Sequence, residues 1–284
     1  MKIFVAGAAG AIGRLSLPML TETGHEVVGM TRDRAKAAQI EHAGASAVVA
    51  DIFDRERIFE LIEELRPDAV IHQLTALSEW NLADNARIRT EGTRNLVDAA
   101  LAANVPRMIV QSISWAYEPG QGIASEGEEL DIEAPEPRKI SVDGVIAMEQ
   151  AAAEMPHAVI LRYGALYGPG TFYEREHGLF AGRVKQGLVP ATDGVTSFLH
   201  VEDAARSAVL ALDWPSGPVN IVDDEPAAGK LWLPLYARSL GAPEPVAQDG
   251  SNRGERGASN TKARQQYGWL PKYPTWREGL LRNN

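Results

Sequence analysis

The sequence predicts an α/β fold, in which a doubly wound parallel sheet is followed by a smaller C-terminal lobe. Short runs rich in β-branched residues alternate with helical stretches through the first half of the 284-residue chain. This pattern is typical of parallel strands joined by crossover helices. The alternation ends near Gly164, where glycine and proline become dense. We therefore expect a first domain at residues 1–163 and a smaller lobe at residues 164–284, which crosses back near residues 198–203.

Six short apolar runs are the expected strands, at residues 3–6, 26–30, 47–49, 69–71, 108–111 and 158–162. Their continuous apolar character predicts burial on both faces of the sheet. The expected helices lie between them, at residues 11–23, 34–43, 55–65, 85–103 and 142–154. The helix at 85–103 has the clearest pattern, because Leu96, Val97, Ala100 and Leu101 form an apolar stripe. Pro67 is expected to end the helix at 55–65.

The composition argues against several classes of protein. A net charge of −10 with interspersed acidic and basic residues argues against a nucleic-acid-binding surface. The absence of cysteine excludes disulfides, thiolate metal sites and a cysteine nucleophile, and no other cluster suggests a metal. Gly7 comes too early to leave room for a secretory signal, and no apolar run approaches the ~20 residues that span a bilayer. We expect a cytoplasmic protein without metal, nucleic acid or membrane as partner.

Three glycines follow the first expected strand at regular spacing. Gly7, Gly10 and Gly13 form a G-x-x-G-x-x-G motif before an apolar helix. Glycine permits a tight turn and lets the backbone approach a pyrophosphate, to which the helix N-terminus offers free N–H groups and a positive dipole. The sequence therefore predicts a Rossmann fold that binds a dinucleotide. The loop residues expected to contact it are the three glycines together with Ala9, Ala11 and Ile12.

The end of the second expected strand distinguishes NAD from NADP. An acidic side chain there accepts hydrogen bonds from the 2′-hydroxyl of NAD and repels the 2′-phosphate of NADP. Thr31 occupies that position, and Arg32 follows it with a guanidinium that can bind a phosphate through two parallel hydrogen bonds. We expect NADP rather than NAD. The alternative is a solvated Arg32 that begins the next helix and is partly neutralised by Asp33.

The glycine spacing and four further segments resemble the short-chain dehydrogenase/reductase superfamily, in particular its extended, epimerase/dehydratase-like branch. The four segments are residues 51–52, 70–75, 161–169 and 198–203. The resemblance implies that Asp51, next to Ile52, contacts the adenine. It also implies cofactor contacts from Leu74, which stands where a small alanine is usual, and from Thr75 and Tyr163.

The Tyr-x-x-x-Lys pair that this family uses for catalysis is missing. In the family, the tyrosine transfers a proton, and the lysine lowers its pKa and holds the ribose. Anchoring the motif on Glu149 places Ser141 at the tyrosine position and Val145 at the lysine position. A serine hydroxyl is a far weaker acid than a phenol, and an aliphatic side chain carries no charge. Neither residue can do the expected work.

Another residue would then have to supply the proton. Tyr117 is the first candidate, because it follows the fifth strand directly and a phenol keeps its proton at neutral pH. His200 is the second, because imidazole titrates near pH 7, although a lone histidine in such a segment is often structural. For the hydroxyl that polarises the substrate oxygen, Ser114 is preferred to Ser112, since it lies nearer the carboxyl end of the strand. Both serines could instead satisfy local backbone groups.

These features predict an NADP-dependent oxidoreductase. It would transfer a hydride to or from a small carbonyl, alcohol or conjugated substrate, with a non-standard proton donor. Two alternatives stay open: an NAD(P)-dependent epimerase or dehydratase, and a non-catalytic redox sensor that holds NADP. The expected partners are a small-molecule substrate and a second copy of the chain, if the alanine-rich face of the helix at 142–154 and the helix at 85–103 pack across a dimer rather than internally.

Overall fold

The computed structural model describes residues 1–76 and 81–281. The chain divides into two compact units, and each is built from separate segments. The first comprises residues 1–112, 135–161 and 205–218, and the second comprises residues 113–134, 162–204 and the chain from residue 219. The expected division into residues 1–163 and 164–284 stays a prediction.

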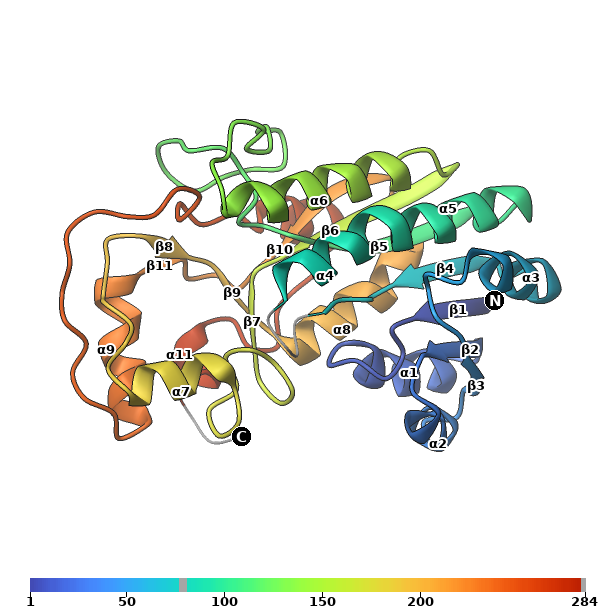
Figure 1. Ribbon diagram of the computed structural model, residues 1–284. Helices are drawn as coiled ribbons and strands as arrows, with labels where there is room; N and C mark the ends of the chain where they lie inside the picture. The colour runs from blue at the N-terminus through green and yellow to red at the C-terminus, as the bar shows by residue number, and fades with distance from the viewer. Residues whose placement is uncertain (77–80, 282–284) are drawn as a thin grey trace. The chain divides into compact units, whose positions relative to one another are not determined.

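A seven-stranded sheet has the order β10-β6-β5-β4-β1-β2-β3 (Figure 1). Its strands are β1 (Lys2–Ala6), β2 (Glu26–Thr31), β3 (Ser46–Val49), β4 (Ala69–His72), β5 (Arg107–Ile113), β6 (His157–Tyr163) and β10 (Gly217–Ile221). The pairs β1–β2, β1–β4, β2–β3 and β4–β5 are parallel. The predicted doubly wound α/β fold is confirmed, and the six predicted strands end within two residues of the observed ones.

Helices follow the strands in the predicted alternation as far as residue 152, and a later helix begins in the second unit and continues into the first. They are α1 (Gly13–Glu22), η1 (Arg34–Lys36), α2 (Ala37–His42), α3 (Arg55–Leu65), α4 (Leu82–Arg87), η2 (Ile88–Gly92), α5 (Thr93–Ala102), α6 (Arg138–Ala152), α8 (Val201–Leu210) and η3 (Ala211–Asp213). Helix α3 has the predicted bounds because Asp54 caps its first turn by accepting a hydrogen bond from Arg57 N. It ends at Leu65, because the next residue, Arg66, has a left-handed φ of 44°.

The predicted single helix at 85–103 differs from the observed chain. Asn81 caps Asp84 N, so that α4 already begins at Leu82. The wider π-helical turn η2 then separates α4 from α5. Helix α6 also begins four residues before the predicted start at 142.

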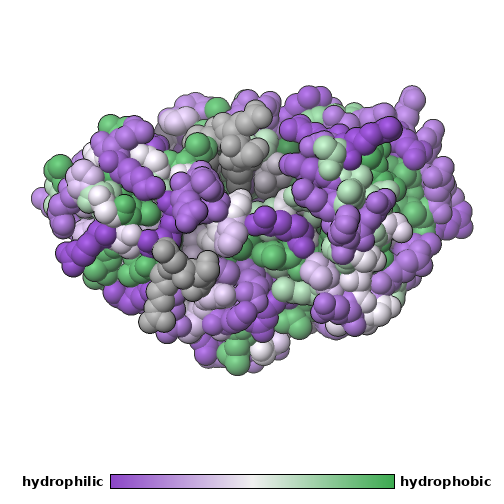
Figure 2. All heavy atoms as spheres, turned by 90° about the horizontal axis from the view of Figure 1, so that it is seen from below, coloured by the Kyte–Doolittle hydropathy of each residue, from purple (hydrophilic) through white to green (hydrophobic). Residues whose placement is uncertain are grey.

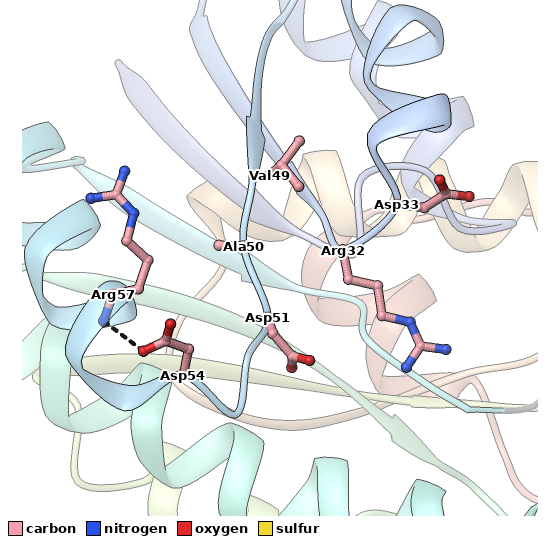
Figure 3. A pocket seen from close by; sticks show the side chains of 7 residues that line it. All are labelled: Arg32, Asp33, Val49, Ala50, Asp51, Asp54 and Arg57. Carbon is pink, nitrogen blue, oxygen red and sulfur yellow. Dashed lines mark hydrogen bonds between the residues drawn. The ribbon is translucent and has the colours of Figure 1, made fainter.

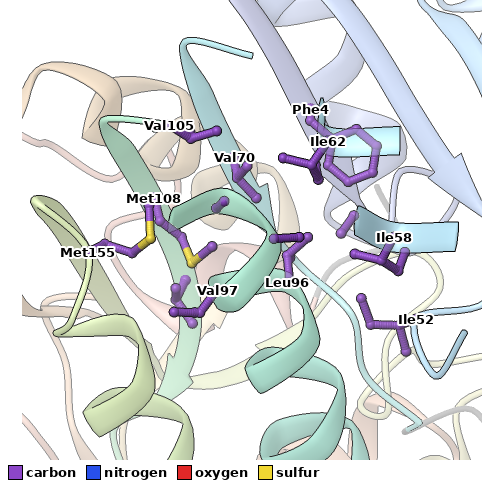
Figure 4. Close-up of a cluster of buried hydrophobic side chains, with 14 of the residues drawn as sticks. Phe4, Ile52, Ile58, Ile62, Val70, Leu96, Val97, Val105, Met108 and Met155 are labelled. Carbon is purple, nitrogen blue, oxygen red and sulfur yellow. The ribbon is translucent and has the colours of Figure 1, made fainter. Parts of the chain in front are cut away.

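The core of the first unit lies on both faces of the sheet. On one face, side chains of β1, β4 and β5 pack against α3, α5 and α6 (Figure 4). The labelled members of this cluster are Phe4, Ile52, Ile58, Ile62, Val70, Leu96, Val97, Val105, Met108 and Met155. Ile3 and Val5 alternate with Phe4 along β1 and are also fully buried. Figure 1 shows α1 and α2 on the side of the sheet opposite α5 and α6, which explains the apolar strands.

The second unit contains short strands, small helices and an aromatic core. Strand β7 (Ala165–Tyr167) pairs in parallel with β9 (Phe198–His200), and β8 (Val195–Thr196) pairs antiparallel with β11 (Ala227–Ala228). The helices are α7 (Leu179–Lys185), α9 (Gly229–Ser239), α10 (Thr261–Tyr267) and α11 (Trp276–Gly279). One cluster of this unit contains the buried aromatic side chains of Tyr167, Phe198, Trp232, Tyr236 and Trp276. Of these, Phe198 and Trp232 meet edge to face at 5.0 Å between ring centroids.

On the face shown in Figure 2, hydrophilic side chains predominate and hydrophobic ones form small groups. Among the described residues, no helix has the length and apolar character needed to cross a membrane. Within the same residues, no group of three or more His, Asp or Glu side chains could hold a metal ion.

Candidate functional site

The loop between β1 and α1 is tight, and its glycines are needed for that shape. Gly7 has a φ of 91°, a left-handed backbone that glycine adopts without strain. A Cβ on Gly7 would lie 2.8 Å from the carbonyl carbon of Gln73, so the loop packs directly on the end of β4. A Cβ on Gly13 would overlap the Gly7 carbonyl oxygen. At Gly10, the one atom of the described residues within 4 Å of a Cβ would be that same oxygen, at 3.2 Å.

Backbone N–H groups at the start of α1 lack acceptors. Gly10 N donates to Gly7 O, whereas the N–H groups of Ala9, Ala11 and Ile12 donate to no acceptor within the described residues. Free N–H groups at a helix N-terminus, together with the helix dipole, bind anions. The predicted loop residues therefore fit the diphosphate of a dinucleotide.

An open pocket lies beyond the carboxyl ends of β2 and β3 (Figure 3). Its lining residues are Arg32, Asp33, Val49, Ala50, Asp51, Asp54 and Arg57. Each of its three carboxylates accepts a hydrogen bond from a backbone N–H two or three residues later. The two residues predicted near the adenine therefore differ in position. Asp51 lines the pocket, whereas Ile52 is buried in the hydrophobic core.

The two guanidinium groups of this pocket differ in their partners. Arg57 Nη1 lies 3.0 Å from the Glu60 carboxylate. Arg32 is exposed, and across the described parts of the chain it forms no hydrogen bond or ion pair. Figure 3 shows the Arg32 and Asp51 side chains extending to the same side, with the Arg57 guanidinium across the backbone from them. Thr31 is buried, and its hydroxyl accepts a hydrogen bond from Asp33 N at 3.2 Å.

A buried histidine shapes the turn after β4. His72 Nδ1 accepts a hydrogen bond from Leu74 N at 3.3 Å, and Nε2 lies 3.0 Å from the Thr93 hydroxyl. Burial, followed by the positive charge of Arg89, lowers the pKa of His72 to about 4. The ring is therefore neutral at pH 7 and acts as an acceptor for the turn. The predicted cofactor residues Leu74 and Thr75 follow it and are half-buried.

The α6 positions of the missing catalytic pair are buried in the first unit. Ser141 is 5% exposed, and Val145 is fully buried. One turn further, the buried Glu149 accepts a hydrogen bond from Ser112 Oγ at 2.6 Å. The predicted Ser112 therefore connects β5 to α6. Neither a phenol nor an ammonium group stands at position 141 or 145.

Arg89, which the sequence analysis did not single out, lies in the π-helical turn η2 and is 5% exposed. Its Nη1 is 3.4 Å from the carbonyl oxygen of Ser141. Single π-helical turns occur frequently at functional sites. A sequence signal exists, because Arg89 precedes Gly92, Thr93 and Leu96 by three, four and seven residues, which is the spacing of one helix face.

The predicted proton donors lie in the second unit. Tyr117 is 1% exposed; its hydroxyl donates to Asn220 Oδ1 at 2.7 Å and accepts from Arg162 Nη1 at 2.9 Å. Burial raises the pKa of Tyr117, and the Arg162 charge opposes that rise. His200 Nδ1 accepts from Glu202 N, and the centroid of its ring lies 3.7 Å from that of the Tyr273 ring, with the two planes tilted by 33°. Burial lowers the pKa of His200.

The remaining two predicted residues meet through their backbones. Ser114 N donates to the carbonyl oxygen of Tyr163 at 2.9 Å. The Tyr163 hydroxyl donates to the carbonyl oxygen of Ala204 at 3.3 Å. Both side chains are buried.

The glycine turn, the amides of α1 and the pocket beyond β2 and β3 define a dinucleotide-binding α/β enzyme. Residues 3–222 match the NAD dependent epimerase/dehydratase family, and the chain belongs to that family. It is 41% identical to the 3-diazoavenalumate denitrifying reductase of a Streptomyces species, over 99% of this chain and 100% of that protein. The predicted superfamily is confirmed, and the chain is an atypical short-chain dehydrogenase/reductase.

Solved structures show the same fold. The UDP-glucose 4-epimerase of Thermotoga maritima, solved with UDP-glucose, matches with a TM-score of 0.78 and 24% identity over 99% of this chain and 96% of that one. The UDP-glucose 4-epimerase of Thermus thermophilus, solved in complex with NAD, matches with a TM-score of 0.75 and 25% identity over 99% and 97%.

Proposed function

We propose that this chain is an NADP-dependent reductase whose substrate takes up a hydride without needing a proton from the protein. The observation that carries the proposal is the pair of buried residues Ser141 and Val145, where the family resemblance implies a phenol and an ammonium group. When bound, the cofactor supplies the hydride. The residues of the chain bind and orient the cofactor and the substrate.

Arg32 and Thr31 support NADP over NAD. Arg32 reaches into the pocket beyond β2 and has no partner among the described residues. A guanidinium matches the planar geometry of a phosphate through two hydrogen bonds. Thr31, in place of an acid, leaves the 2′-position without the repulsion that favours NAD.

The proposed substrate class is an arenediazonium carboxylate. The reductase of the Streptomyces species, 41% identical to this chain, is named for a diazo substrate and for denitrification. An arenediazonium cation and a hydride combine to an arene and N₂: the C–N bond breaks, a C–H bond forms, and NADPH becomes NADP⁺. Charge and atoms balance without a proton, so a site that lacks the family's acid suits this acceptor.

The test is a reduction followed through both products. The purified protein is given NADPH deuterated at the transferable position and an arenediazonium carboxylate labelled with ¹⁵N. We expect one labelled N₂ per NADPH consumed and deuterium in the new C–H bond, with NADH a poorer donor. Oxidation of NADPH without N₂, or a product hydrogen that comes from solvent, would contradict the proposal.

Carbonyl reduction is a second candidate, favoured by the hydrogen bond between Arg162 and Tyr117. A guanidinium 2.9 Å from a phenol stabilises the phenolate that forms when the proton leaves. In this scheme Tyr117 is the donor, His200 is the second choice, and Ser114 is the hydroxyl that polarises the substrate. Tyr117→Phe separates the two functions, because it should abolish reduction of a ketone and leave reduction of an arenediazonium unchanged.

A further inference from the structure

Arg89 is a buried cation with few partners. Its side chain makes one hydrogen bond among the described residues, the 3.4 Å contact with the Ser141 carbonyl, and it forms no ion pair there. The charge of the Glu149 carboxylate raises the pKa of Arg89, but the two groups form no ion pair among the described residues. Glu149 instead accepts a hydrogen bond from the Ser112 hydroxyl. Burial lowers the pKa of Arg89 to about 10, so the guanidinium stays charged at neutral pH. The other Arg89 nitrogens have no acceptor among the described residues and are not among the fully buried unpartnered atoms there, so they border space in which a ligand can supply acceptors.

The position of Arg89 identifies that ligand. Towards β4, its charge acts on His72, whose strand end packs directly on Gly7 of the diphosphate loop. Towards α6, a Cβ on Gly144 would lie 3.6 Å from the Arg89 Cβ, so the side chain starts from the α6 turn that contains Ser141. Arg89 therefore lies between the diphosphate loop and the turn at which the resemblance implies a lysine for the ribose.

We infer that Arg89 binds the nicotinamide-side ribose of the cofactor, supplying from η2 the cation that Val145 cannot supply from α6. The guanidinium donates hydrogen bonds to the ribose hydroxyl oxygens through the nitrogens that have no acceptor among the described residues. This inference rests on the proposed function, because it requires a bound dinucleotide.

The test compares two ligands that share the phosphate-bearing adenosine half but differ in the nicotinamide half. Binding of NADPH and of 2′,5′-ADP is measured by titration calorimetry for wild type, Arg89→Gln and Arg89→Lys. We expect Arg89→Gln to weaken NADPH by about 10-fold or more, in line with loss of a charge-assisted hydrogen bond, and to leave 2′,5′-ADP within about twofold. Arg89→Lys keeps a donor and should retain most of the affinity.

The control is Arg94→Gln, which removes the same charge from a residue of α5 that pairs with Asp98 and Glu154. It should leave both ligands unchanged. Equal NADPH affinity in wild type and Arg89→Gln would overturn the inference. It would do so even if the KM for a carboxylate substrate rose in Arg89→Gln, because Arg89 would then bind the substrate rather than the cofactor. Equal loss of both ligands in Arg89→Gln would assign Arg89 to the fold and overturn it as well. A wild-type protein that binds neither ligand would instead refute the proposed function.

Discussion

Replacing Arg32 by glutamine should convert a preference for NADP into near indifference between the two cofactors. The change removes the exposed guanidinium of the pocket beyond β2 and keeps a side chain of similar length. Hydrogen bonds to charged groups contribute about 1.5–3 kcal/mol, and exposure together with salt favours the lower end of that range. We therefore expect NADP to bind about 10-fold more weakly at physiological ionic strength.

The structure also predicts what should stay constant. NAD has no 2′-phosphate, so its affinity for Arg32→Gln should stay within about twofold of wild type. The matched control is Arg57→Gln, which removes an equal charge from the same pocket but from a group that already pairs with Glu60 at 3.0 Å. It should change the affinity for NADP by less than about threefold.

Fluorescence titration with NADPH and NADH measures both affinities for each variant. The reasoning is refuted if Arg32→Gln weakens the two cofactors equally, since the side chain would then act on the shared part of the molecule. It is also refuted if Arg57→Gln reproduces the effect, because the loss would then follow net charge rather than a phosphate contact.

Three further variants test other features of the structure. Gly13→Ala should abolish binding of NADPH and lower the thermal unfolding temperature, because its Cβ would overlap backbone atoms of the loop; retention of both would contradict the packing seen at Gly7. Arg253→Met should lower the urea concentration at the midpoint of unfolding, because it removes the two hydrogen bonds of 2.8 and 2.6 Å that Arg253 donates to the buried Asp131 carboxylate; an unchanged midpoint would refute this. Burial raises the pKa of Asp223 to about 8. Between about pH 4 and pH 8 the folded chain therefore keeps a proton that the unfolded chain has released. The free energy of unfolding falls as the pH rises through this range, by at most ~1.4 kcal/mol per pH unit. Asp223→Asn should flatten that slope in urea unfolding at several pH values, and a slope equal to that of wild type would exclude the titration.

The features that the sequence predicted correctly are those with local causes. The turn at Gly7 follows from a backbone conformation that glycine adopts at that position. The bounds of α3 follow from Asp54 at one end and from the chain turning at Arg66 before Pro67 at the other. The position of Arg32 beyond β2 follows from strand length alone, because a residue just after a parallel strand lies at the carboxyl edge of the sheet.

The features that the sequence did not predict depend on contacts between distant segments. The π-helical turn η2 interrupts a helix whose apolar stripe continues without a break, so periodicity alone gives one helix. An arginine on an amphipathic helix ordinarily lies in solvent, and Arg89 is buried because α6 packs over it near Gly144. The hydrogen bond of Tyr117 to Asn220 joins residues more than one hundred positions apart, which no local pattern indicates.

The interleaving of the two units limits how this enzyme can be recombined. The chain passes from one unit to the other five times, after residues 112, 134, 161, 204 and 218. A chimera with a single junction at residue 163 would therefore take residues 205–218 of the first unit from the second parent. Grafting a new second unit requires three segments to be exchanged together. Specificity in such a chain is expected to diversify by point substitution within segments rather than by shuffling of whole modules.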